Sequence, residues 1–126
     1  MGDEPKRTPL HDWHTSHGAD MVNFSGWRMP LWYPSGAVTE HRVVVTQVGM
    51  FDTSHMSVVM VEGPNAFELL QRCFTRDLLN CGGKDGVPLK PGQSVFGAFL
   101  NEAGETVDDS VVFQTAEAKY MVVVNA

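Results

Sequence analysis

Cysteine and positive charge are both scarce in this sequence. Its 126 residues include only two cysteines, Cys73 and Cys81, which are too few for a disulfide framework and are not spaced like zinc ligands. We therefore predict two free thiols, with Cys73 a small core residue. Nine Lys and Arg face fifteen Asp and Glu, and the longest basic cluster is Lys6-Arg7. This balance does not predict a nucleic-acid-binding protein, because such proteins carry a basic patch.

Long apolar runs and phosphate-binding motifs are also missing. No stretch reaches the roughly 18 apolar residues of a membrane-spanning helix, so no membrane span is expected. There is no G-x-G-x-x-G motif, no Walker loop and no G-x-S-x-G motif. The opening segment, MGDEPKRTPL, lacks the apolar region of a signal peptide. We expect a bacterial-type cytoplasmic protein, or a protein of the mitochondrial matrix if the source is eukaryotic.

The sequence does contain helical patterns mixed with extended ones, followed by consecutive strands. This order predicts an α+β fold with helices packed on an antiparallel sheet. Residues 1–126 are interpreted as the N-terminal part of a longer domain region, because the chain stops just after an apolar strand. The expected helices are 8–18, 37–48 with Ser35 as its cap, and 65–74. Within 21–36 we expect a short strand followed by a packed loop. Further strands are expected at 56–63 and 119–126, and 93–102 with 105–114 should form a hairpin. Residues 80–92 are expected to form an exposed loop.

Two adjacent acids, Asp108 and Asp109, lie in the middle of the predicted strand ETVDDSVVFQ. Side chains alternate between the faces of a strand, so these two acids point in opposite directions. One face carries Asp109 among the apolar residues Val107, Val111 and Phe113, while the face of Asp108 is more polar and is expected to be solvated. A charge among apolar side chains needs a partner. Asp109 is therefore the candidate functional acid, as an acid/base or an anchor for N–H groups, and a structural Asp bonded to a turn is the alternative.

Aromatic residues near Asp109 predict a flat apolar slot. Phe96 and Phe113 fall on the two strands of the predicted hairpin, and Met56 begins another strand. Small-molecule pockets are mostly apolar with a few polar anchors, so this set suits a flat heteroaromatic ligand with ring N–H donors. The commoner alternative is that these side chains simply belong to the core.

Three histidines, His11, His14 and His17, repeat at every third position of the first predicted helix. Successive pairs could hold a metal, but all three drift around the helix and no acid or cysteine completes a ligand set. We favour a polar helix flank and predict no metal site. The segment MFDTSHM contains the residue types of a hydrolase triad, but close sequence neighbours cannot meet as a triad does.

Five segments occur in a defined order along the chain. They are KRTPLHDWHTSHGADMVNFSGWRMPLWYPSG, VGMFDTSHM, GPNAFELLQR, FLNEAGETVDDSVVF and YMVVVNA. Together they resemble the N-terminal part of the aminomethyltransferase family, the T-protein of the glycine cleavage system. The resemblance runs from Lys6 to Ala126, and chains of the family are much longer.

This resemblance implies a folate-binding α+β domain within a larger enzyme. Family members take the one-carbon unit of an aminomethyl group carried on the lipoylated H-protein, pass it to tetrahydrofolate and release ammonia. The family's essential acid is the second Asp of its DD motif, which is Asp109 here. Met56 of the SHM motif and Asn125 of the VVNA motif match positions expected to contact the folate. The full set of expected folate contacts is Met56, Phe96, Val111, Phe113 and Asn125.

Departures from the family pattern bear on the one-carbon donor more than on the fold. Phe96 and Phe113 stand where the family often has Tyr, which removes two hydroxyl groups. The chain also has Thr75-Arg76-Asp77 where the family has Thr-Asn-Asp, and Ser110 where it has Leu. The alternatives are a related tetrahydrofolate-dependent demethylase, acting on other amines or on sulfonium compounds, and a non-catalytic folate-binding module.

Overall fold

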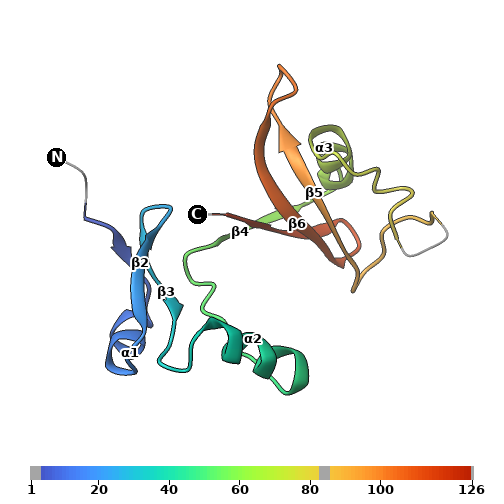
Figure 1. Ribbon diagram of the computed structural model, residues 1–126. Helices are drawn as coiled ribbons and strands as arrows, with labels where there is room; N and C mark the ends of the chain where they lie inside the picture. The colour runs from blue at the N-terminus through green and yellow to red at the C-terminus, as the bar shows by residue number, and fades with distance from the viewer. Residues whose placement is uncertain (1–3, 83–85, 126) are drawn as a thin grey trace. The chain divides into compact units, whose positions relative to one another are not determined.

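The computed structural model describes residues 4–82 and 86–125 and contains two compact units (Figure 1). Unit 1 extends to His55, and unit 2 runs from Met56 to Asn125. Unit 1 contains β1 (Lys6–Arg7), α1 (His11–Ser16), β2 (Asp20–Phe24), β3 (Trp27–Trp32) and α2 (Ala37–Thr46). Unit 2 contains β4 (Ser57–Glu62), α3 (Ala66–Cys73), β5 (Ser94–Leu100), β6 (Thr106–Ala116) and β7 (Lys119–Val124). Helices mixed with mainly antiparallel strands confirm the α+β class.

The small sheet of unit 1 has the strand order β1-β3-β2. Its hairpin, β2-β3, turns at Ser25-Gly26, where both residues have positive φ angles, 49° and 82°. Two successive residues with positive φ form a turn whose twist matches the twist of the paired strands. The Gly26 N–H also donates to Asn23 Oδ1 at 3.0 Å within this turn. The predicted short strand is confirmed as β2. The packed loop expected after it is wrong, because Trp27–Trp32 form a second strand.

Both predicted helices of unit 1 are confirmed, but their beginnings differ from the prediction. α1 begins at His11, because the chain from Thr8 forms a separate turn in which the His11 N–H donates to the Thr8 carbonyl at 3.1 Å. α2 begins after Gly36, and Ser35 does not cap it. Instead, the Ser35 hydroxyl donates to the Glu40 carboxylate at 3.2 Å. α2 has no buried residue, so its valine-rich stripe is exposed.

Unit 2 is built on a four-stranded antiparallel sheet with the order β4-β7-β6-β5 (Figure 1). One face of this sheet packs against α3 and the segment that follows α3. Leu70 and Leu78 contribute to this core from the helical side, and Val112 contributes from the sheet. Leu78 and Val112 are both completely shielded, with 0% exposure. The predicted strand 56–63, helix 65–74, hairpin and last strand are all confirmed with slightly shifted bounds.

Two predictions about burial in unit 2 are wrong. Cys73 is exposed, because the face of α3 that turns inward carries Ala66 and Leu70 and continues into Phe74. Leu89 belongs to the loop predicted to be exposed, yet it is buried and its N–H donates to the Leu78 carbonyl at 2.8 Å. The central part of that loop, residues 83–85, lies outside the described residues.

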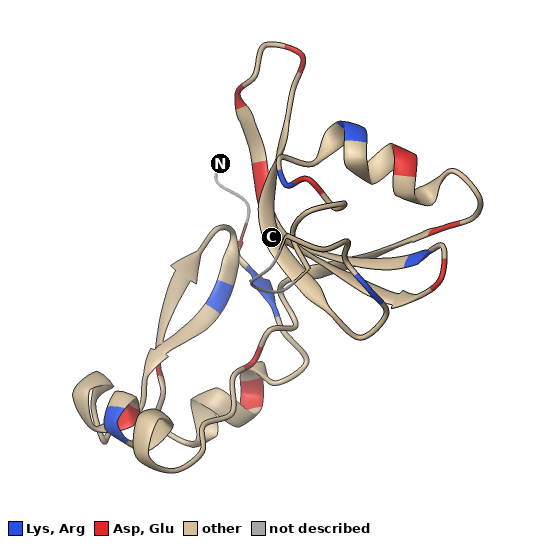
Figure 2. Cartoon of the chain, turned by 90° about the vertical axis from the view of Figure 1, so that its right-hand side faces the viewer, with Lys and Arg blue, Asp and Glu red and all other residues tan. Residues whose placement is uncertain are grey.

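The charged residues of unit 2 include a group of acids on the β5-β6 hairpin. Figure 2 shows them at the hairpin tip and on the strand itself, and the acids within β6 are Asp108 and Asp109. In the part of the chain that the structure describes, no helix is long and apolar enough to cross a membrane. Because these two acids lie on β6, the candidate functional site is sought on the faces of the unit 2 sheet.

Candidate functional site on the open face of the second sheet

β6 divides its side chains between a core face and an open face. Ser110, Val112 and Gln114 point into the core, with exposures of 2%, 0% and 8%. Asp109 points to the opposite face and is exposed. The prediction that the more polar face is solvated is therefore wrong. Asp108 is half-buried and Asp109 is exposed, as alternation requires, but both carboxylates reach the same amide nitrogen of Asn125. The polar face is buried because neighbouring strands supply its apolar packing, which the β6 sequence alone does not reveal.

The strand register assembles an apolar surface around Asp109 on the open face. Val111 lies opposite Phe96 of β5 on one side and Val123 of β7 on the other. Phe113 lies opposite Met121 of β7. Phe96 is 62% exposed, so it belongs to a surface and not to the core of unit 2. Three of the predicted site residues, Phe96, Val111 and Phe113, are thus neighbours on one face.

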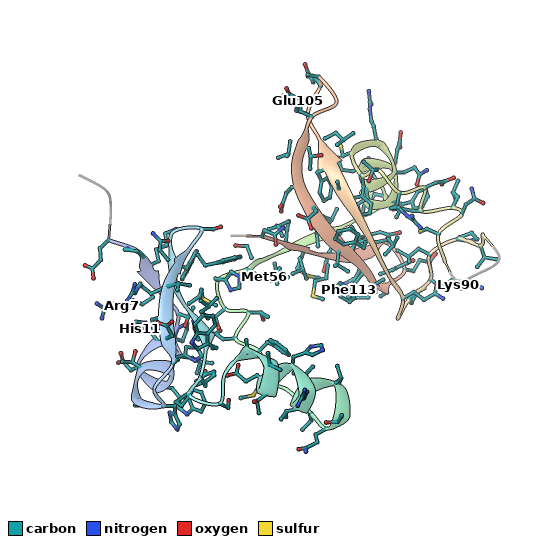
Figure 3. All side chains as sticks on the ribbon, viewed as in Figure 1. Arg7, His11, Met56, Lys90, Glu105 and Phe113 are labelled. Atoms are coloured by element: carbon teal, nitrogen blue, oxygen red, sulfur yellow. The ribbon has the colours of Figure 1, made fainter. Side chains whose placement is uncertain are left out.

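Met56 lies at the margin of this surface. It is half-buried and directly precedes β4, which is separated from β6 by β7 (Figure 3). The alternation of side chains continues from Met56 to Val58 and Met60, which are 57% and 51% exposed. Met56 therefore extends the apolar surface toward β4 but does not lie next to Asp109.

Asn125 bonds to both acids of β6. Its side-chain amide nitrogen lies 2.9 Å from Asp108 Oδ1, 2.9 Å from the Asp109 carbonyl oxygen and 3.0 Å from Asp109 Oδ1. Its backbone N–H donates to Asp108 Oδ2 at 3.0 Å. An amide NH2 has only two hydrogens, so at least one of them is shared between acceptors. Asn125 thus fixes the orientation of Asp109, a contact that sequence reasoning did not identify.

Asp109 keeps one carboxylate oxygen free within the described chain. Only Oδ1 accepts a hydrogen bond from the described residues, and that bond comes from Asn125. Its cross-strand partner on β5 is Ala98, whose single methyl group leaves space above the carboxylate. An oriented carboxylate with one open oxygen on an apolar surface can accept an N–H donor or a proton from a bound molecule.

Asp108 has a supporting position. Hydrogen bonds from the Asn125 side chain lower the pKa of this carboxyl and outweigh the effect of its partial burial, which would raise it. The Ser110 hydroxyl lies 3.5 Å from Asp108 Oδ2 and adds to this effect. Asp108 is therefore kept charged as the acceptor that holds Asn125 in place.

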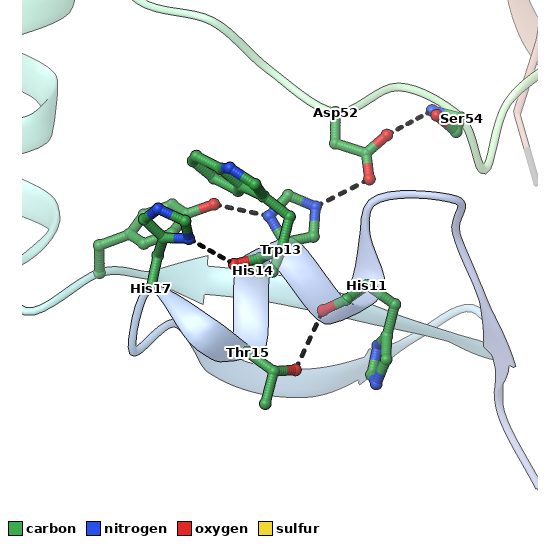
Figure 4. Close-up of polar contacts among 8 residues, drawn as sticks. His11, Trp13, His14, Thr15, His17, Asp52 and Ser54 are labelled. Carbon is green, nitrogen blue, oxygen red and sulfur yellow. Dashed lines mark hydrogen bonds and ion pairs between the residues drawn. The ribbon is translucent and has the colours of Figure 1, made fainter.

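A second polar cluster, formed by Tyr33, His14 and Asp52, lies inside unit 1 (Figure 4). His14 Nε2 lies 2.9 Å from Asp52 Oδ2, and His14 Nδ1 lies 2.6 Å from the Tyr33 hydroxyl. The side chains of His14 and Asp52 are 4% and 1% exposed. Because a carboxylate only accepts hydrogen bonds, Nε2 carries the proton toward Asp52. Burial and the nearby charges of Glu40 and Asp52 raise the pKa of Tyr33, so its hydroxyl stays protonated in this contact with Nδ1.

The acid of this cluster is fully engaged. Burial alone would raise the pKa of Asp52, but hydrogen bonds from His14 and Ser54 outweigh it and hold that pKa well below its usual range. The Ser54 N–H donates to Asp52 Oδ1 at 2.9 Å, which leaves neither oxygen open. The cluster is therefore structural. Sequence reasoning missed it because His14 and Asp52 are 38 positions apart and no local spacing links them.

A hollow of about 700 Å³ lies beside this cluster in unit 1. Its lining is largely apolar, with Trp13, Trp32, Val44 and Phe51 among the contributing residues. Three of the polar residues that reach it, His14, Tyr33 and Asp52, already bond to each other. The hollow therefore offers a largely apolar surface.

The histidines of α1, His11 and His14, and the residue that ends the helix, His17, have three different surroundings. His14 joins the buried cluster, while His17 stacks on Trp13 at 4.0 Å between ring centroids. The His11 ring points away from Asp52 (Figure 4). Among the described residues, no group of three or more His, Cys, Asp or Glu is placed to hold a metal ion.

Comparisons with known proteins agree with this geometry. A family model described as the GCVT N-terminal domain matches residues 10–126. An aminomethyltransferase from Desulforamulus reducens is 42% identical over 123 residues, which is 98% of this chain and 31% of that protein. One from Rubrobacter xylanophilus is 42% identical over 121 residues, covering 96% of this chain and 30% of that protein.

A solved structure extends the likeness to three dimensions. The crystal structure of the glycine cleavage system aminomethyltransferase T from Bartonella henselae is similar with a TM-score of 0.78 and 40% identity. The match covers 96% of this chain and 31% of that one. The present chain thus spans about a third of the length of the relatives that it matches.

Proposed function

We propose, since this chain belongs to the GCVT N-terminal domain family, that it provides the folate-binding face of an aminomethyltransferase of the glycine cleavage system. The reaction would move the one-carbon unit of an aminomethyl group, carried on the lipoyl arm of H-protein, to tetrahydrofolate with release of ammonia. The observation that carries this proposal is Asp109. It is a carboxylate with one free oxygen, oriented by Asn125 on an open apolar sheet face.

The open face suits a flat ring system with N–H groups. Phe96, Val111 and Phe113 provide an apolar surface against which the pterin ring of a folate can lie. The free oxygen of Asp109 would accept an N–H of that ring and take up the proton that the attacking amine must lose. Asn125 would hold the carboxylate in position during this transfer. Met56 would contact the ligand at the margin of the surface.

The positions where the chain departs from the family pattern divide by location. Ser110 is buried in the core, and Arg76, which stands where the family has Asn, is exposed in the segment that follows α3. Phe96 and Phe113 are the departures that lie on the open face. The two lost hydroxyl groups therefore change the hydrogen bonds available to a donor group bound beside the folate. The identity of the one-carbon donor is accordingly a separate part of the proposal.

The proposal also includes a protein partner and a location. The lipoylated H-protein would deliver the donor group, and tetrahydrofolate would be the small-molecule acceptor. The relatives reported above are bacterial, which supports a cytoplasmic location.

The test compares the two neighbouring acids in the complete enzyme that carries this sequence. Asp109→Asn keeps the shape but removes the proton acceptor, so kcat for tetrahydrofolate-dependent release of ammonia should fall by about a hundredfold or more. Asp108→Asn removes an acceptor of Asn125 and should cost less than tenfold, because Asp109 itself remains. The assay would use aminomethyl groups on H-protein, with dimethylglycine and a sulfonium donor in parallel.

Two results would count against this assignment. Equal losses for the two variants, or full activity of Asp109→Asn, would remove Asp109 from the reaction. Faster turnover with dimethylglycine or with the sulfonium donor would replace the aminomethyl donor while leaving the folate site in place.

A further inference from the structure

Arg7 and Arg28 lie side by side in the small sheet of unit 1. They are direct partners in the parallel pairing of β1 with β3, so their side chains leave the same face of the sheet. Lys6 is the next residue of β1, and its ammonium group lies 5.3 Å from the centroid of the Trp27 ring. Figure 2 shows the blue segments of Lys and Arg in this sheet. Like charges at paired positions repel each other, so this arrangement is unfavourable unless an anion lies between them.

Both arginines face a cavity of about 370 Å³ within unit 1. His11, from the beginning of α1, and Glu4 also line it, and Thr15 of α1 completes its polar wall. Arg7 and His11 lie on the same side of the unit (Figure 3). A volume of this size holds a small charged group with its water, and it is too small for a folate-sized ligand.

Hydrogen-bond donors outnumber acceptors in this cavity. Arg7 pairs with Glu4 at 3.1 Å, and no ion pair to Arg28 occurs among the described residues. His11 Nδ1 is buried and has no hydrogen-bond partner in the part of the chain that the structure describes. The Thr15 hydroxyl donates its proton to the His11 carbonyl at 3.0 Å, so its oxygen can only accept further bonds. One carboxylate therefore faces two guanidinium groups and an unsatisfied imidazole nitrogen.

We infer that this cavity binds a phosphate group, either as inorganic phosphate or as the phosphate of a small monoester. A guanidinium is planar and presents paired N–H donors that match the oxygens of phosphate. A phosphate has enough oxygens to accept from Arg28 and Arg7 together, whereas a single carboxylate can satisfy only one guanidinium fork fully. The site lies in unit 1, it uses none of the residues assigned to the folate face, and it goes beyond the proposed transfer reaction.

Titration of the full chain with inorganic phosphate at constant ionic strength tests this site. Binding would be followed by calorimetry and by the NMR signals of the arginine Nε–H groups, which should shift for Arg7 and Arg28. Arg28→Gln removes a charged donor and should weaken binding at least about tenfold. Arg42→Gln is the matched control, since it makes the same charge change on the exposed surface of α2, away from the cavity.

The melting temperature of Arg28→Gln shows whether this variant is still folded. Without phosphate it should melt at the same temperature as the unmodified chain or higher, because the repulsion from Arg7 is relieved. Absence of phosphate binding to the unmodified chain, or equal losses in Arg28→Gln and Arg42→Gln, would overturn the inference. Tighter binding of succinate than of phosphate would also overturn it, in favour of a dicarboxylate site. Glucose 1-phosphate, as a parallel probe, shows whether the cavity also accepts a monoester.

Discussion

Asn125 places one amide group between two neighbouring acids, and this contact gives Asp108 and Asp109 different tasks. Asp108 accepts both the backbone and the side-chain N–H of Asn125, so it holds that residue in place. Asp109 receives the remaining contact on Oδ1 and keeps its other oxygen free within the described chain. One acid therefore supports the position of Asn125, and the other is available to a ligand.

The different surroundings of Asp108 and Asp109 could be predicted from the sequence, whereas their contact with Asn125 could not. Side-chain alternation places neighbours on opposite faces whatever surrounds the strand. The pairing of Asn125 with these acids depends on the register of β6 with β7, which shifts between Gln114 and Ala116. Such an irregularity moves every later pairing by one position, so counting from the turn does not find the partner. Burial of the polar face depends likewise on residues of other strands.

At the same scale, the Asp52 carboxylate predicts a pH dependence of stability. The folded-state pKa of Asp52 lies below its ordinary value of about 3.9, so its hydrogen bonds stabilise the fold fully above that value. Their contribution is lost as the pH falls from about 4 through the lowered folded-state pKa. At pH 7, Asp52→Asn should reduce the free energy of unfolding by about 2 kcal/mol, because it replaces a buried charged hydrogen-bond acceptor with an amide.

Urea unfolding of both proteins at pH 7 and at pH 3 measures this effect. The difference between Asp52→Asn and the unmodified chain should shrink at pH 3, because the Asp52 carboxyl of the unfolded chain takes up a proton there while that of the folded chain stays ionised. Asp20→Asn is the control, since Asp20 is an exposed acid of the same unit. Equal costs for the two substitutions at pH 7, or a difference that does not change with pH, would contradict the role assigned to Asp52.

At the scale of elements, the sequence predicts the strands and helices of unit 2 well and misses β3 in unit 1. Pro30 made a second strand there unexpected, because proline cannot donate to a sheet. The structure accommodates Pro30 because β1 pairs only with Trp27 and Arg28, so at Pro30 strand β3 is an edge. The length of the neighbouring strand decides this, and that length depends on tertiary packing.

The two faces of β6 differ in what they contribute to stability, which a pair of identical substitutions can measure. Val112 is completely buried in the core, whereas Val107 of the same strand is 67% exposed. Val112→Ala removes buried methyl groups and leaves a cavity, so it should cost about 2 kcal/mol of unfolding free energy. Val107→Ala should change it by less than about 0.5 kcal/mol. Urea denaturation gives both values, and equal costs would mean that the assignment of core and open face is wrong.

At the scale of the whole molecule, the two units differ in how much apolar surface each buries internally. Among the described residues, the buried core cluster belongs entirely to unit 2, whereas Met29 is the buried hydrophobic residue of unit 1. Sequence composition could not show this difference, because both units are rich in apolar residues. The valines of α2 lie at helical spacing, yet none of them is buried.

The two longer helices provide the test of this difference, because length and packing oppose each other in them. α2 has 10 residues and none buried, while α3 has 8 residues and buries Ala66 and Leu70 against the sheet. Helices this short are marginal in water without tertiary contacts, so packing should decide their stability over length. In the 126-residue chain, amide hydrogens of α2 should exchange at least about tenfold faster than those of α3, which opens together with the core. Hydrogen exchange followed by NMR measures both helices in one sample, with the amides of β6 as the internal reference for the core. Equal protection of α2 and α3 would show that contacts outside the described packing hold α2 in place.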